Sequence, residues 1–137
     1  MSYDTCLCMG LRSAAQQLTR KYDSAINAAG ITVNQFSLMS LIRSLEEPTM
    51  KDLAEASGLD RSTLGRNLRV LEKQALISLK TGEDARTRVI HLTREGRAAF
   101  RRAAPLWQET QESLLERLGP EKRLQLQSLL DELTATA

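Results

Sequence analysis

One short segment, residues 81–96 (TGEDARTRVIHLTREG), departs from the helical pattern that the rest of this chain follows. Its first four residues favour a turn, and the run 88–93 mixes β-branched residues with a period near two, which is typical of a strand. The residues before the turn supply a second strand. We therefore expect a two-stranded hairpin that carries Arg86 and Arg88 at or beside its tip.

Helical periodicity predicts the fold on both sides of this hairpin. Apolar residues recur at three- and four-residue steps, and Gly or Pro ends most of these runs. Thr32, Thr49 and Thr93 are placed to cap helices, as is either Asp60 or Ser62. The fold class is therefore mainly α. The expected helices cover about residues 7–29, 33–45, 50–57, 61–74 and 93–118, with a kink at Pro105 and a last helix after Gly119-Pro120.

Length and composition agree with a single helix-rich domain. The chain has 137 residues, of which 42% are hydrophobic and only 4% aromatic, so we expect one domain over residues 1–137. No apolar run approaches the roughly 20 residues that a membrane-spanning helix requires. The first residues lack the basic start of a secretory signal. We therefore expect a cytoplasmic protein with no membrane partner.

The middle of the chain has the pattern of a helix-turn-helix. Two short helices meet across SGLD, residues 57–60, and the second presents the side chains that DNA recognition uses. A hairpin directly after such a helix forms a wing, whose Arg86 and Arg88 can enter the minor groove. The alternative is an ordinary amphipathic helix with a solvated face. The candidate DNA contacts in the helix are Arg61, Ser62, Thr63, Arg66, Asn67, Arg69 and Lys73.

Charge is distributed unevenly along the chain. Residues 61–102 contain eleven Lys or Arg and four acids, a net charge of +7, whereas the other 95 residues contain eight basic and thirteen acidic groups, or −5. A concentrated basic surface is typical of proteins that bind phosphate. The alternative is that acids distant in sequence lie close in space and neutralise it.

With this helix-turn-helix and wing, the sequence resembles the MarR family of bacterial winged-helix regulators over about residues 5–135. DARTRVIHLTREG (84–96) is similar to the family's Asp-x-Arg wing, hydrophobic strand and Leu-Thr-x-x-Gly, and LDRSTLGRNLRVLEKQALI (59–77) is similar to its recognition helix. The chain departs from the family at Gly65, Ala75 and Leu79, where Thr, Gly and Arg are common.

This resemblance implies a homodimer with a triangular helical frame that binds a palindromic operator in double-stranded DNA. The winged helix would cover about residues 32–96, and the dimerisation helices about 4–30 and 97–137. In the wing, we expect Asp84 to hold an arginine partner such as Arg61 or Arg88.

Dimerisation is also expected from the residues themselves. The first and last helices carry apolar stripes that a domain of this size cannot bury entirely against its own core, and two-fold pairing is the commonest way to cover them. A monomeric bundle is the alternative. The leucines concerned near the end of the chain are Leu114, Leu115, Leu118, Leu126, Leu129, Leu130 and Leu133.

Cys6 and Cys8 are the only cysteines. One interpretation is that they are small buried hydrophobes. Another is that they belong to a metal site, although a closed zinc site takes four ligands and no others lie nearby in the sequence. A third interpretation comes from similarity to the organic-hydroperoxide-sensing branch of the MarR family. That similarity places Cys8 at the reactive cysteine and Tyr22 at a tyrosine that contacts it from the other subunit, whereas Val33 replaces a second tyrosine. Cys6 of either subunit, or an external thiol, would then resolve a sulfenic acid.

Other functions remain open. MarR-like dimers also respond to aromatic or phenolic ligands, for which Arg12, Phe36, Met39 and Trp107 are candidate contacts. The sequence shows no constellation for a metal or cofactor and only one His, so we do not expect an enzyme. Thiol peroxidase chemistry at Cys8 and a helical protein–protein adaptor are the alternatives from other classes. The sequence thus predicts a dimeric DNA-binding repressor controlled by oxidation or by a ligand.

Overall fold

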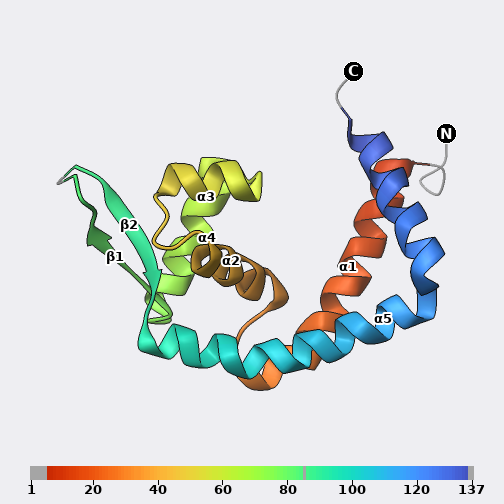
Figure 1. Cartoon of the computed structure of the whole chain (residues 1–137), viewed down its shortest axis with the longest axis horizontal. Coiled ribbons are helices and arrows are strands. Elements are labelled where there is room, and N and C mark those ends of the chain that lie inside the picture. Colours follow the sequence, from red (N-terminus) through yellow and green to blue (C-terminus); the bar gives the residue numbers. More distant parts are fainter. Residues whose placement is uncertain (1–5, 85, 136–137) are drawn as a thin grey trace.

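The computed structural model describes residues 6–84 and 86–135, and in these residues the predicted mainly α fold with a two-stranded sheet is confirmed. The sheet and three short helices form a lobe at one end of the long helix α5, and α1 extends away from this lobe (Figure 1). The elements are α1 (Leu7–Ile26), the 3₁₀ turn η2 (Asn27–Ala29), α2 (Val33–Ser44), α3 (Met50–Ser57), α4 (Arg61–Lys73), β1 (Ile77–Thr81), β2 (Arg88–Leu92) and α5 (Arg94–Thr134).

The helix starts follow the predicted caps. Thr32 begins α2 with a complete capping box, in which its hydroxyl accepts from the Gln35 amide and the Gln35 side chain accepts from the Thr32 amide. Thr49 and Asp52 form the same reciprocal pair at the start of α3. Such pairs satisfy amides that have no partner within the helix. Of the two candidates for α4, Asp60 is the cap.

The two strands pair antiparallel, from Ile77 opposite Leu92 to Thr81 opposite Arg88. One face is buried at the end of the sheet near α4 and α5, where Ile77, Ile90 and Leu92 lie in the core, and exposed toward the wing tip. The segment before α3 extends this sheet, because the Ile90 amide donates to the Pro48 carbonyl at 2.9 Å and Thr49 bridges to Val89. The wing is therefore attached to the lobe along β2 as well as at its ends.

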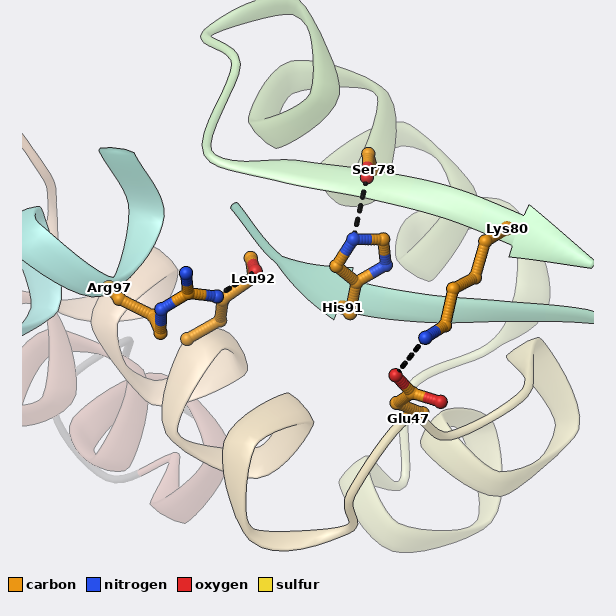
Figure 2. Close-up of polar contacts among 6 residues, drawn as sticks. All are labelled: Glu47, Ser78, Lys80, His91, Leu92 and Arg97. Atoms are coloured by element: carbon orange, nitrogen blue, oxygen red, sulfur yellow. Dashed lines mark hydrogen bonds and ion pairs between the residues drawn. The ribbon is translucent and has the colours of Figure 1, made fainter. Parts of the chain in front are cut away.

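Polar contacts join β1 to β2 and β2 to the start of α5 (Figure 2). Ser78 Oγ and His91 Nε2 are 3.0 Å apart, and Arg97 donates to the Leu92 carbonyl at 2.9 Å. The second of these contacts ties the first turns of α5 to the end of β2.

The hydrophobic core lies where α2, α4, the sheet and the first turns of α5 meet. Leu64, Leu68 and Leu71 of α4 are buried, as their spacing predicts. Of the face predicted for α2, Phe36, Met39 and Ile42 are buried, but Leu45 is 39% exposed because the helix has ended before it.

Helix α5 is broken at Gly119, where two helical segments meet. Gly119 has φ 81° and ψ 163°, which are non-helical angles, so the predicted stop and restart at Gly119-Pro120 is confirmed. Pro105 lies inside the helix with helical residues on both sides, and the kink expected there stays a prediction. Pro105 is exposed. The carbonyl that loses its N–H partner there can bond to water, which keeps the cost of the proline small.

The ends of α4 and the start of α5 meet in one tight junction. The Thr93 hydroxyl donates to the Ala75 carbonyl at 2.6 Å, and the Thr93 amide donates to the Leu76 carbonyl at 3.1 Å. Ala75 has φ 61°, a left-handed conformation that is costly for a residue with a side chain. A Cβ on Gly96 would lie 2.0 Å from the Leu76 carbonyl oxygen, so the two backbones are in direct contact.

Among the described residues, no single helix is long and apolar enough to cross a membrane. The stretch Leu7–Ala29 with Val33–Ser44 meets that test of length and composition only as a pair bent by 72°. The predicted single domain also includes residues 1–5, 85 and 136–137, which lie outside the described residues.

We expect Gly96→Ala to lower the free energy of unfolding by about 3 kcal/mol, because the new methyl group would displace the Leu76 backbone. Gly65→Ala is the matched control, since a Cβ there meets only the end of the Arg69 side chain at 3.8 Å. That variant should gain about 1 kcal/mol from helix propensity. Urea denaturation measures both, and equal stability of the two variants would contradict the close contact.

The Asp60 cap predicts a pH dependence of stability. Hydrogen bonds from Thr63 lower the pKa of Asp60 below its ordinary value of 3.8. A carboxyl group with a lowered pKa stabilises the fold above its unfolded value and loses that contribution as the pH falls through the folded value. We expect the stability advantage of the wild type over Asp60→Asn, which retains a capping oxygen, to shrink as the pH falls below 3.8. A difference that stays constant in urea titrations from about pH 6 downward would exclude this linkage.

Candidate nucleic-acid interface

The outward face of α4 is polar and basic. Burial of Leu64, Leu68 and Leu71 fixes the inward side of this helix. A period of 3.6 residues places a second set of side chains opposite them. All members of that set are exposed: Ser62, Arg66, Arg69 and Lys73.

Hydrogen bonds at the start of α4 orient this face. Asp60 accepts from the Thr63 amide at 2.8 Å and from the Thr63 hydroxyl at 3.1 Å. Arg66 Nη2 in turn donates to the Thr63 hydroxyl at 3.3 Å. Thr63 is half-buried, and its hydroxyl is already hydrogen-bonded within the chain. It is therefore better placed to orient Arg66 than to contact DNA directly.

Arg61 and Asn67 lie on opposite flanks of α4. Both are exposed, but Asn67 lines the hollow between α4, α2 and α5, together with Asn34 and Leu38. The structure therefore places Asn67 away from the centre of the basic face on which the sequence had grouped it. Arg61 lies on the other flank, beside Gly65.

Two hydrogen bonds to Asp84 hold the wing tip. The Asp84 carboxylate accepts from the Arg86 amide at 3.0 Å, and its carbonyl accepts from the Thr87 amide at 2.9 Å. The expected arginine side-chain partner of Asp84 was wrong for the part of the chain that the structure describes. Asp84 instead shapes the loop from which Arg86 projects, and Arg86 and Arg88 are both exposed.

An ion pair that sequence reasoning missed links the wing to the lobe. Lys80 of β1 contacts Glu47 in the turn between α2 and α3, and both side chains are 48% exposed (Figure 2). No other ion pair is found among residues 6–84 and 86–135. The remaining basic groups of residues 61–102 thus form no ion pair with an acid of the described residues, although Arg66 lies close enough to Asp60 to lower the pKa of that carboxyl group.

The cysteines lie at the start of α1, far from the lobe. Cys6 is the N-cap residue and is half-buried, whereas Cys8 is exposed in the first turn, and both are free thiols. The Tyr22 hydroxyl donates to Gln111 of α5 in the same chain, and burial raises the pKa of Tyr22. In the single chain, Tyr22 thus joins α1 to α5. No group of three or more His, Cys, Asp or Glu in the described segments is placed to hold a metal ion.

A hollow of about 1040 Å³ is lined by residues of α2, the end of α3, α4 and α5. Phe36 and Phe100 stack there with ring centres 4.8 Å apart, and Trp107 lies 5.7 Å from Phe36. The Arg43 guanidinium lies 5.1 Å from the centre of the Phe100 ring.

Of the four residues predicted for a ligand crevice, Phe36 and Trp107 line this hollow. Met39 is fully buried in the core and Arg12 lies on α1, so neither lines this hollow in the single chain. Arg43 was missed, although its spacing of seven residues from Phe36 places both on one face of a helix.

Known proteins of the MarR family are similar to this chain. A MarR family model matches residues 29–87. The organic hydroperoxide resistance transcriptional regulator of Bacillus subtilis (strain 168) is 32% identical over 97 residues, which cover 70% of this chain and 66% of that protein. The HTH-type transcriptional regulator FarR of Neisseria gonorrhoeae is 32% identical over 126 residues, which cover 91% and 86%.

A solved structure agrees in fold and sequence. The transcriptional regulator MosR of M. tuberculosis, crystallised in complex with DNA, is 40% identical and superposes with a TM-score of 0.78, covering 90% of this chain and 92% of that chain. These relatives are named as transcriptional regulators and not as enzymes, which confirms that expectation. From its winged lobe and its similarity to FarR over most of both sequences, the chain belongs to the MarR family of transcriptional regulators.

Proposed function

We propose that this chain acts in the cytoplasm as a homodimeric repressor that binds a palindromic operator. The observation that carries the proposal is the basic outward face of α4, next to a wing whose tip exposes Arg86. Helix α4 would enter the major groove, and the wing would reach the adjacent minor groove. The similarity to MosR, which was solved with DNA, supports this function.

Exposed leucines support the homodimer. Several large apolar side chains on α1 and on the C-terminal half of α5 are open to solvent in the single chain, and pairing of two chains would bury them. Two recognition helices about 34 Å apart would then match half-sites one helical turn apart. These side chains are Leu7, Leu11, Leu18, Leu118, Leu124, Leu126, Leu129 and Leu133.

Within the interface, we assign base contacts to Ser62 and Arg66 and phosphate contacts to Arg69 and Lys73. Arg66 lies near the start of α4, which is the end that reaches base edges in helix-turn-helix proteins. Lys73 lies in the last turn, where a flexible point charge suits a phosphate.

The regulatory step that we propose is oxidation of Cys8. A Cys8 thiolate would attack one oxygen of an organic hydroperoxide, the O–O bond would break, and the alcohol would leave after protonation, so that sulfur carries the hydroxyl of a sulfenic acid. The exposure of Cys8 and the similarity to the hydroperoxide regulator of Bacillus subtilis support this step. Cys6 or an external thiol would resolve the sulfenic acid.

The aromatic hollow favours a second candidate for regulation. Phe36, Phe100 and Trp107 offer ring surfaces and Arg43 offers a cation, which together suit a small aromatic anion. Such a ligand would lie between the lobe and α5, where it can change the angle between them.

For DNA binding, we expect Arg86→Ala to weaken operator affinity by about 1–3 kcal/mol through loss of a groove contact. Arg101→Ala is the matched control, because it removes an equal charge from an exposed position on α5, which lies on the side of the lobe away from the wing tip (Figure 1). Fluorescence anisotropy on an operator duplex measures both. Equal losses from the two variants would show that the wing contributes only general charge.

For regulation, we expect Cys8→Ser to bind the operator as tightly as the wild type but to stay bound after stoichiometric cumene hydroperoxide. Cys6→Ser should still release, because the first oxidation occurs on Cys8. Operator affinity and intact-protein mass are measured on the same samples. If the wild type is oxidised at Cys8 and keeps its full affinity, the thiol switch is wrong. Release by benzoate, lost in Arg43→Ala, would then support the aromatic hollow.

A further inference from the structure

Helix α4 carries a glycine, Gly65, in its second turn. A glycine inside a helix destabilises it by roughly 1 kcal/mol relative to alanine. Gly65 is not among the glycines with positive φ, which are Gly30, Gly58 and Gly119. The backbone of α4 therefore does not need a glycine at this position.

Packing within the chain does not require Gly65 either. A Cβ built there meets one atom within 4 Å, the Nη1 of Arg69 at 3.8 Å, which is an ordinary contact with the end of a flexible side chain. Gly96 provides the contrast, because its backbone lies against the Leu76 carbonyl. Neither the backbone of α4 nor its packing against the described residues therefore accounts for Gly65, and the flank of α4 at this position is open to a partner outside this chain.

Gly65 forms a notch on one flank of α4. At about 100° per residue, Arg61 and Arg69 lie about 40° to either side of it around the helix. Both arginines are exposed, whereas Gly65 is half-buried between them. The notch thus lies beside the outward basic face, with a cation at each edge.

The width of the DNA major groove limits how closely a helix such as α4 can approach the bases. The major groove is about 12 Å wide, and a helix with its side chains is about 10–12 Å across, so a side chain on the flank limits how deeply the helix can lie. We propose that Gly65 is a close-approach position, at which the flank of α4 lies against the sugar–phosphate wall of the major groove. The deeper position brings Ser62 and Arg66 to the base edges.

This inference rests on the proposed DNA-binding function and adds a residue that sets its specificity. A larger residue at position 65 would lift α4 outward and lengthen the contacts to bases. Phosphate contacts from long side chains such as Arg69 and Lys73 would adapt, because those side chains are flexible. The loss should therefore fall mainly on the discrimination between sequences.

The test compares two labelled duplexes, one enriched from a random-sequence library by the wild-type protein and one with the same bases scrambled. We expect Gly65→Ala to raise the folding equilibrium constant about fivefold, as its helix propensity implies. The same variant should bind the enriched duplex at least about tenfold more weakly and the scrambled duplex within about twofold. Gly65→Thr should lose more affinity for the enriched duplex than Gly65→Ala.

Ala75→Gly is the matched control. It relieves the left-handed strain at the end of α4 and adds no atom to the flank, so it should stabilise the protein without changing affinity for either duplex. Unchanged or tighter binding by Gly65→Ala, equal losses on both duplexes, or tighter binding by Gly65→Thr would each overturn the close approach. If the wild type enriches no duplex, the proposed function itself fails, and this outcome is distinct from the others.

Discussion

The lobe depends on one contact between two backbones, where Gly96 in the first turn of α5 lies against the Leu76 carbonyl. At this point the chain leaves α4, enters β1, returns through β2 and begins α5, so one junction fixes the directions of four elements. Thr93 stabilises the junction twice, through its hydroxyl to Ala75 and its amide to Leu76. The angle between α4 and the wing therefore follows from this contact and not from the wing tip.

Local physics made much of this fold predictable from sequence. Caps such as Thr32 and Thr49 act on amides within three residues, and the leucines of α4 repeat with the period of a helix, so both signals are complete within a short segment. The pairing of Glu47 with Lys80 and of Pro48 with Ile90 depends on how distant segments meet. No spacing in the sequence encodes those contacts.

In the candidate site, too, the local features could be predicted from the sequence and the contacts between distant segments could not. The exposed face of α4 follows from its buried leucines, but the position of Asn67 beside the hollow depends on how α2 and α5 pack against it. The partner of Asp84 could have been found, because an aspartate in a turn often bonds to the backbone amide two residues later. That bond forms within the turn itself, whereas a pair with an arginine side chain depends on how the rest of the wing is arranged.

Helix α5 is the element through which an event at α1 can reach the wing. The Tyr22–Gln111 hydrogen bond joins α1 to the middle of α5, and Arg97 with Gly96 joins the start of α5 to the sheet and to Leu76. Between these two attachments α5 has no non-helical residue, because its bend at Gly119 lies beyond Gln111. A continuous helix can carry a displacement along its length even where Pro105 removes one hydrogen bond, and packed contacts at its ends tend to shift between discrete arrangements. Under the proposed regulation, a change in the packing of α1 would therefore move the wing and α4 together, which alters the spacing of the two recognition helices without unfolding either lobe.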